Sequence, residues 1–238
     1  MKLDILAIGV HPDDIELGCG GTLLKHIEMG KKVGILDLTR GELGTRGSAA
    51  LRVKEAEAAR KKMGALVREN LKMKDGFFQH TQENMLKIAK VIRQYQPEIV
   101  LANAISDRHP DHGRASKLTA DACFISGLAK VKTYHKRKLQ ERWRPKAVYH
   151  YIQDHTLKPD FVVDITGYMD EKIDLVLCFA SQFYNPKSKE LQSPISSKSF
   201  LESVRAKSSI YGRTSGVEYA EGFNTAHPVG VNDLFDIF

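Results

Sequence analysis

Short apolar segments alternate with helical segments along most of this chain of 238 residues, and this alternation is the strongest constraint on its fold. The apolar runs at 3–10, 33–39 and 98–104 have the length and composition of strands buried on both faces, and shorter strand patterns occupy 147–152 and 160–165. Helical spacing is found at 15–29, 49–63, 83–95, 113–127, 168–183 and 198–211. We therefore predict an α/β fold, a mostly parallel sheet with helices on both faces, as a single domain over 1–238.

Two related tetrapeptides follow two of these predicted strands. HPDD occupies residues 11–14 and HPDH occupies residues 109–112. The segments after them share no pattern beyond helical spacing, so whole units are not repeated. Ligands of open α/β sheets bind outside the carboxyl ends of the strands. Both tetrapeptides are therefore expected at one rim of the sheet, as two halves of one site.

The residue types in the two tetrapeptides predict a metal site. His11, Asp14 and His112 supply two imidazoles and one carboxylate, and three protein ligands are typical of a catalytic zinc. The same set also suits a facial Fe²⁺ site, so zinc is a preference. Either tetrapeptide alone would be read as a capped turn, because Pro and Asp are common in turns. Their joint placement at one rim favours the metal site.

Three further residues of the tetrapeptides have candidate catalytic roles. Asp13 is adjacent to Asp14 and points elsewhere, so it is the candidate base for water activated by the metal. His109 is the candidate acid for the leaving group, or a stabiliser of the oxyanion. Asp111 is expected to hydrogen-bond an imidazole and fix its tautomer.

Arginines flank the predicted site. The Gly-rich loop 40–48 follows the second predicted strand, and Arg108 precedes His109. Arginine binds carboxylates and phosphates through two parallel hydrogen bonds. Arg46, Arg52 and Arg108 are therefore candidates for binding an anionic substrate, whereas Arg40 reads equally well as a solvated residue.

Composition narrows the class of protein. The formal charge of +7 lies entirely in residues 130–146, which hold eight Lys or Arg and one Glu, and we read this stretch as a solvated connector and expect no nucleic-acid partner. No apolar run has transmembrane length, and residues 1–14 do not suit a secretory signal, so we expect a cytoplasmic protein without a membrane partner. The three cysteines, Cys19, Cys123 and Cys178, are expected to be buried and unpaired.

The two tetrapeptides at these positions resemble the LmbE-like, or GlcNAc-phosphatidylinositol de-N-acetylase, family. Further stretches, DLTRGELGTRG (37–47), SQFYNP (181–186) and GVEYAEGF (216–223), look like its bacillithiol biosynthesis deacetylase branch, which acts on N-acetylglucosaminyl-malate. The resemblance implies a Rossmann-like fold, one divalent metal that is usually zinc, and an anionic N-acetylglucosamine conjugate as substrate. It also implies a trimer or hexamer, for which the long loop 181–198 would suit an interface.

The resemblance also assigns residues. It implies His11, Asp14 and His112 as metal ligands, Asp13 as base, His109 as acid or stabiliser, Asp111 as its support, and Arg52 as the loop arginine. Some relatives are proposed to use a tyrosine against the oxyanion, and Phe200 occupies that position here.

Three other functions compete with this interpretation. Asp37 ends the second predicted strand, as in dinucleotide-binding oxidoreductases, but GVHPDDIELG contains no GxGxxG and its two carboxylates would repel a pyrophosphate. A metal-binding scaffold would have no need of Asp13 and His109. The third alternative is the hydrolysis of another amide, either in a different N-acetylglucosamine conjugate or in a thiol conjugate.

Overall fold

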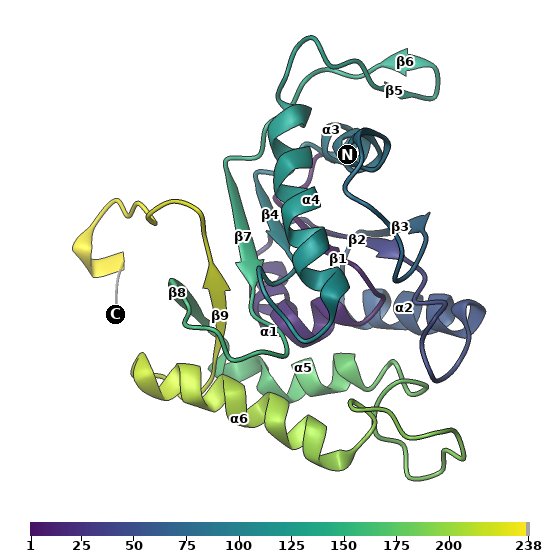
Figure 1. Ribbon diagram of the computed structural model, residues 1–238. Helices are drawn as coiled ribbons and strands as arrows, with labels where there is room; N and C mark the ends of the chain where they lie inside the picture. Colours follow the sequence, from purple (N-terminus) through teal and green to yellow (C-terminus); the bar gives the residue numbers. More distant parts are fainter. Residues whose placement is uncertain (237–238) are drawn as a thin grey trace.

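A seven-stranded sheet in the order β3-β2-β1-β4-β7-β9-β8 runs through the centre of the protein (Figure 1). The structure is a computed structural model that describes residues 1–236. The strands are β1 (Ile5–Gly9), β2 (Val33–Thr39), β3 (Val67–Met73), β4 (Ile99–Ala102), β7 (Ala147–Tyr151), β8 (Phe161–Asp164) and β9 (Ala220–Asn224). The five strands from β3 to β7 in this order are parallel to their neighbours, and β9 is antiparallel to β7 and β8. This arrangement confirms the predicted α/β fold with a mostly parallel sheet.

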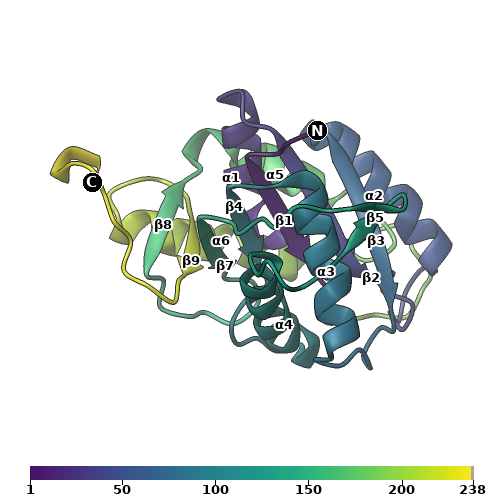
Figure 2. The same ribbon diagram turned by 90° about the horizontal axis from the view of Figure 1, so that it is seen from above.

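Helices cover both faces of the sheet, as Figure 2 shows from above. One face carries α3 (Gln82–Tyr95) and α4 (Pro110–Ser126), and the other carries α1 (Asp14–Glu28), α2 (Ala49–Met63) and α5 (Met169–Val176). The last long helix, α6 (Lys198–Thr214), packs on β9. Short elements complete the order: the hairpin of β5 (Tyr134–His135) and β6 (Lys138–Leu139), and the 3-10 turns η1 (Thr166–Tyr168) and η2 (Leu234–Asp236).

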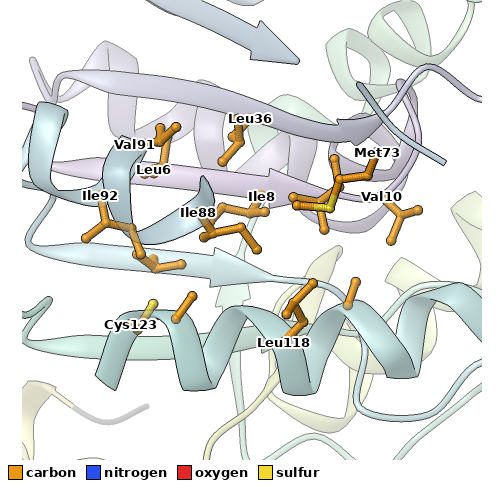
Figure 3. Close-up of a cluster of buried hydrophobic side chains, with 14 of the residues drawn as sticks. Leu6, Ile8, Val10, Leu36, Met73, Ile88, Val91, Ile92, Leu118 and Cys123 are labelled. Carbon is orange, nitrogen blue, oxygen red and sulfur yellow. The ribbon is translucent and has the colours of Figure 1, made fainter. Parts of the chain in front are cut away.

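Strand β1 shows why its sequence is almost continuously apolar. Leu6 and Ile8 point into the cluster under α3 and α4, which Figure 3 shows, whereas Ile5 and Ala7 point into the cluster under α1. All four side chains are buried. Each of the three Leu and Ile side chains contributes about 1.5–3 kcal/mol when it is removed from water, and Ala7 contributes less, so both faces of this strand stabilise the sheet.

Two strands of the central sheet and the end of one helix differ from the prediction. The sequence does not predict strand β3 because Glu69 interrupts the apolar alternation of VRENLKM. The strand lies at one edge of the sheet and is only half-buried along most of its length. Strand β9 was missed because AEGFN is short and contains glycine. The helix predicted at 168–183 ends at Val176, because Phe179 and Phe183 turn back to pack against α2.

Other predictions fall in the connections. The basic stretch 130–146 forms the connection around the β5–β6 hairpin. Cys19 and Cys123 are buried and unpaired as expected, but Cys178 is partly exposed, because the chain has left α5 at that point. Within residues 1–236, no helix combines the length and the apolar composition needed to cross a membrane.

Candidate metal and catalytic site

The two tetrapeptides meet because β1 and β4 are neighbours. The strands pair in parallel, with Ile5 opposite Ile99 and Ala7 opposite Leu101. Both chains therefore leave the sheet at the same rim, which confirms the predicted placement. Helix α4 begins at Pro110, three residues before the predicted start, because proline is favoured at the first helical position. His112 is therefore held on the first turn of a helix.

Asp14 is the centre of the cluster. It is 2 % exposed at the start of α1, and its Oδ2 accepts hydrogen bonds from Val10 N (2.9 Å), His11 N (3.0 Å) and Asn103 Nδ2 (2.9 Å). Its other oxygen, Oδ1, lies 3.2 Å from His112 Nε2 and 3.7 Å from His11 Nδ1. One carboxylate oxygen thus faces two imidazole nitrogens, while the other oxygen is saturated by donors of the protein.

Each imidazole is anchored through its second nitrogen by a carboxylate. His11 Nε2 lies 3.0 Å from Asp75 Oδ1, and His112 Nδ1 lies 2.8 Å from Asp107 Oδ2. Histidines that bind metals usually donate their other ring N–H to a carboxylate in this way. The nitrogens turned toward Asp14 are the ones that could ligate. The donor set therefore fits a divalent metal held by His11, Asp14 and His112.

Sequence reasoning missed Asp75 and Asp107. Asp75 follows β3, and recognition of that strand would have placed it at the same rim. Asp107 lies between β4 and α4, two residues before HPDH, and its position alone gave no sign of its role.

The charges of the cluster show how strongly its groups are coupled. Burial lowers the pKa of His11 and of His112, but nearby carboxylates together outweigh it, Asp14 and Asp75 for His11 and Asp14 and Asp107 for His112. The pKa values rise to about 9 and about 10. Burial alone would raise the pKa of Asp14, yet the two imidazoles hold it well below its usual range. Despite burial, the His112 imidazole lowers the pKa of Asp107 to about 2. The imidazoles and carboxylates of the cluster thus stabilise one another's charged forms.

Asp13 occupies a strained and buried position. Its φ of 137° and ψ of −22° lie in a region that L-residues rarely adopt. Its Oδ2 lies 2.8 Å from Arg52 Nη2, and that nitrogen also donates to Pro12 O at 2.7 Å. Burial raises the pKa of Asp13 to about 7, although Arg52 opposes the shift. The backbone thus turns the Asp13 carboxylate away from Asp14 and toward Arg52.

His109 is the N-cap of α4 and belongs to the same cluster. Its Nδ1 accepts the Asp111 backbone N–H at 3.3 Å, which leaves the ring proton of a neutral imidazole on Nε2. Burial and the nearby His11 lower its pKa. The rings of His109 and His112 are stacked at 5.2 Å, and ligand nitrogens of His11, His109 and His112 lie within 4.8 Å of one another.

Asp111 does not make the predicted hydrogen bond to an imidazole. Its carboxylate accepts from Gly76 N at 2.9 Å and pairs with Arg114 at 2.7 Å. The nearest imidazole nitrogen, His11 Nε2, is 3.8 Å away, which is too far for a hydrogen bond. The role expected of Asp111 is filled by Asp75 and Asp107.

A cavity of about 320 Å³ opens beside the cluster. Its wall includes all three predicted metal ligands, Asp13, His109 and the three candidate arginines, together with residues of α5, α6 and β9. Phe200 also lines it, so the position of the tyrosine in some relatives faces the cavity here as an aromatic ring without a donor. The volume suits a small organic ligand such as a sugar conjugate.

The candidate arginines differ in what they contact. Arg52 donates to Pro12, Asp13 and Gly41, so its guanidinium supports Asp13, and it also lines the cavity. Arg46 is also buried; it donates to Ser188 Oγ at 2.6 Å and so holds the loop 181–198. Arg108 pairs with Asp154 at 2.5 Å, but 47 % of its side chain is exposed. It is the candidate arginine most accessible to a ligand.

Comparisons with known proteins agree with this geometry. The model of the GlcNAc-PI de-N-acetylase (PIG-L) family matches residues 6–123. Diacetylchitobiose deacetylase of Thermococcus kodakarensis is 31% identical over 92% of this chain and 81% of its own. The 4-oxalmesaconate hydratase of Pseudomonas putida is 27% identical over 94% of this chain and 89% of its own.

A solved structure extends the similarity to the whole fold. The conserved protein TT1542 of Thermus thermophilus matches with a TM-score of 0.86 and 36% identity, over 98% of each chain. The family model spans both tetrapeptides, and the match to the deacetylase relative covers most of both chains. On these grounds the chain belongs to the GlcNAc-PI de-N-acetylase (PIG-L) family.

Proposed function

We propose that this protein is a metal-dependent hydrolase that removes the acetyl group from an N-acetylglucosamine conjugate. One observation carries the proposal: Asp14 Oδ1 faces a nitrogen of each of two imidazoles, and a second carboxylate, Asp13, lies beside it in the wall of the cavity. The family assignment supports deacetylation, because a deacetylase relative aligns over most of the chain.

The metal would be held by His11 Nδ1, Asp14 Oδ1 and His112 Nε2. Two imidazoles and one carboxylate suit zinc, and they also suit Fe²⁺. When bound, such a cation would polarise the amide carbonyl and lower the pKa of a water molecule. Asp75 and Asp107 keep the two rings oriented for it.

Asp13 would act as the general base. A carboxylate whose pKa is raised to about 7 accepts a proton near neutral pH and can give it up again. Arg52 holds this carboxylate at the cavity and keeps it from pairing with the imidazoles. The proton of the attacking water would pass to Asp13.

His109 would be the hydrogen-bond donor of the site. Its neutral ring carries the proton on Nε2, because Nδ1 accepts the backbone N–H of Asp111. This proton can serve the developing oxyanion or the leaving amine. Phe200 lines the cavity but cannot donate a hydrogen bond, so stabilisation of the oxyanion would fall to the His109 N–H and the charge of the metal.

The aglycone of the conjugate is proposed to be anionic, with malate as the first candidate. Arg108 and Lys207 both line the cavity, and Arg108 is accessible at its wall. A malate group has two carboxylates, and an accessible guanidinium binds a carboxylate through two hydrogen bonds.

The test compares three substrates with the metal-loaded full chain: N-acetylglucosaminyl-malate, N,N'-diacetylchitobiose and free N-acetylglucosamine. Acetate release from each is quantified. A kcat/KM for the malate conjugate at least tenfold above both neutral sugars, and lowered by Arg108→Gln much more for that substrate than for the neutral sugars, supports the anionic aglycone. A preference for the disaccharide would overturn malate as the aglycone and leave the proposed deacetylase activity standing. Release from no N-acetylated substrate, with metal confirmed in the protein, overturns deacetylation and directs attention to the water-addition chemistry of the hydratase relative.

A further inference from the structure

A lysine of α6 is bound to the turn that follows β7. Lys207 Nζ donates to the main-chain oxygen of Gln153 at 2.5 Å and to that of Asp154. Lys207 lines the same cavity and lies 53 residues or more along the chain from this turn. Two of its three N–H donors are therefore used to hold the backbone of the turn 153–155 in place.

The turn 153–155 contacts the first metal ligand directly. Gln153 Nε2 donates to Asp14 Oδ1 at 2.9 Å. Oδ1 is the oxygen that faces both imidazoles. The Gln153 amide therefore orients the Asp14 carboxylate from the side of the cavity. Gln153 Oε1 is buried and makes no hydrogen bond within the described residues, which indicates that the side chain is held for its N–H donor alone.

The same turn holds the second ligand through Asp107. Asp107 accepts the backbone N–H of Asp154 at 3.2 Å and that of His155 at 3.1 Å. Its Oδ2 also contacts His112 Nδ1 at 2.8 Å. The orientation of the His112 ring thus depends on a carboxylate that the turn positions with two main-chain donors.

The ion pair of Arg108 and Asp154 adds a third connection. Arg108 Nε lies 2.5 Å from Asp154 Oδ2, and Arg108 N donates to Asp107 at 2.6 Å. The turn 153–155 is therefore joined to the segment before HPDH by both side-chain and main-chain contacts. Helix α6 contributes Lys207 to these contacts.

We propose that Lys207 is a positioning residue for the metal site: it holds the turn 153–155, which orients Asp14 Oδ1 through Gln153 and His112 through Asp107. The inference rests on the proposed function, since it requires that these two residues bind a metal. Gln153 and Asp107 hydrogen-bond the two ligands directly, and loss of such a partner commonly changes metal affinity by about 10–100-fold. Lys207 would act through both of them.

The experiment measures metal binding in the full chain. The dissociation constant for Zn²⁺ is determined by chelator competition, and the absorption spectrum is recorded with Co²⁺, for the wild type and for Lys207→Met, Lys207→Arg, Gln153→Leu and Lys25→Met. Lys207→Met should weaken Zn²⁺ binding by about tenfold and alter the Co²⁺ spectrum. Gln153→Leu should act in the same direction. Lys207→Arg keeps two donors for the carbonyls and should restore most of the affinity.

Lys25→Met is the matched control. Lys25 Nζ also donates to a main-chain oxygen, that of Asp164, at 2.8 Å, but it is not part of the cavity wall. Its removal should lower thermal stability without changing the Zn²⁺ affinity or the Co²⁺ spectrum. Circular dichroism checks that each variant is folded, and Gln153→Leu keeps the test decisive if Lys207→Met does not fold.

The outcomes separate the two proposals. A wild type that binds metal, with Lys207→Met or Gln153→Leu of equal affinity and unchanged spectrum, overturns this inference and leaves the proposed function standing. A wild type that binds neither Zn²⁺ nor Co²⁺ overturns the proposed function and this inference with it.

Discussion

At the scale of single residues, Asp13 combines a rare backbone conformation with burial beside a charge. A φ of 137° at a residue with a side chain costs on the order of 1–3 kcal/mol, which the surrounding contacts must offset. The hydrogen bonds of Arg52 to Asp13 Oδ2 and Pro12 O are such contacts. The strain places two neighbouring carboxylates in two environments, with the pKa of Asp14 lowered and that of Asp13 raised.

Asp13→Asn tests the base. The amide keeps the shape of the side chain but cannot take a proton, so turnover of the N-acetylated substrate should fall by about 10²–10⁴-fold. Metal content should stay at the wild-type level, because Asp14 and the two imidazoles are untouched. Steady-state acetate release and metal analysis of the same sample measure both quantities. A variant that retains turnover within a few-fold of the wild type would rule out Asp13 as the base.

His150 of β7 predicts a pH dependence of stability. Its ring is 7 % exposed and donates from Nδ1 to Asn103 O, and burial lowers its pKa below the ordinary value. The unfolded chain therefore binds a proton at a higher pH than the folded protein does. The free energy of unfolding should be highest above about pH 6.5 and fall as the pH drops from there toward the lowered folded pKa.

Urea unfolding of the wild type and of His150→Gln between about pH 5 and 8 measures this contribution. The glutamine cannot titrate, so the free energy of unfolding should vary less with pH in the variant. Because other groups titrate in both proteins, the informative quantity is the difference between the two curves. Parallel curves would contradict a lowered pKa at His150.

At the scale of elements, glycines in α1 let the helix pack closely on the sheet. A Cβ at Gly18 would lie 2.2 Å from Tyr151 Cδ2 of β7, whereas a Cβ at Gly20 would meet its nearest neighbour, Lys172 Cγ, at 3.6 Å. Tyr151 is fully buried and its hydroxyl donates to Ile8 O, so it has little freedom to move. The two positions lie on either side of a kink in α1 at Cys19 (φ −145°, ψ 20°) and differ in available space.

Gly18→Ala and Gly20→Ala form a matched pair. Overpacking at Gly18 should destabilise the protein by about 1–3 kcal/mol. Gly20→Ala should be neutral or stabilise it by up to about 1 kcal/mol, because alanine loses less backbone freedom in a helix. Denaturant unfolding measures both values. Equal free energies for the two variants would contradict the close contact of α1 with β7.

At the scale of the whole molecule, the metal would join parts of the chain that fold from distant segments. His11 and Asp14 follow β1, and His112 lies on α4 about a hundred residues later. A ligand that binds only the folded state stabilises it by about 2.7 kcal/mol at a concentration of 100 times Kd. For a chain of 238 residues this corresponds to a rise in Tm of about 5–10 °C.

Calorimetry with Zn²⁺ and with a chelator tests this expectation. The chelated protein should unfold at the lower temperature, and His112→Asn should show little difference between the two conditions. A wild type whose Tm is the same in both conditions would show that the cluster does not bind zinc tightly at the concentration used.

The sequence by itself determined which strands and which candidate metal ligands form the site. The apolar runs at 3–10 and 98–104 predicted buried strands, and the tetrapeptides after them placed His11, Asp14 and His112 at one rim. This inference succeeded because neighbouring parallel strands end at the same edge of a sheet, so local pattern and topology are linked. The predicted start of α4 was three residues too late, since the helical pattern of its polar first turn is weak.

Only the tertiary structure decided which other groups hold these candidate ligands in place. Asp75 follows a strand whose charged sequence conceals it, and Asp107, Gln153 and Lys207 act through contacts between segments far apart in the chain. Such contacts also join Arg52 to Asp13, a pairing that the sequence did not predict. Periodicity reports which side of an element is buried, but a hydrogen bond depends on the position of its partner to within a few tenths of an ångström, and packing of the whole chain sets that position.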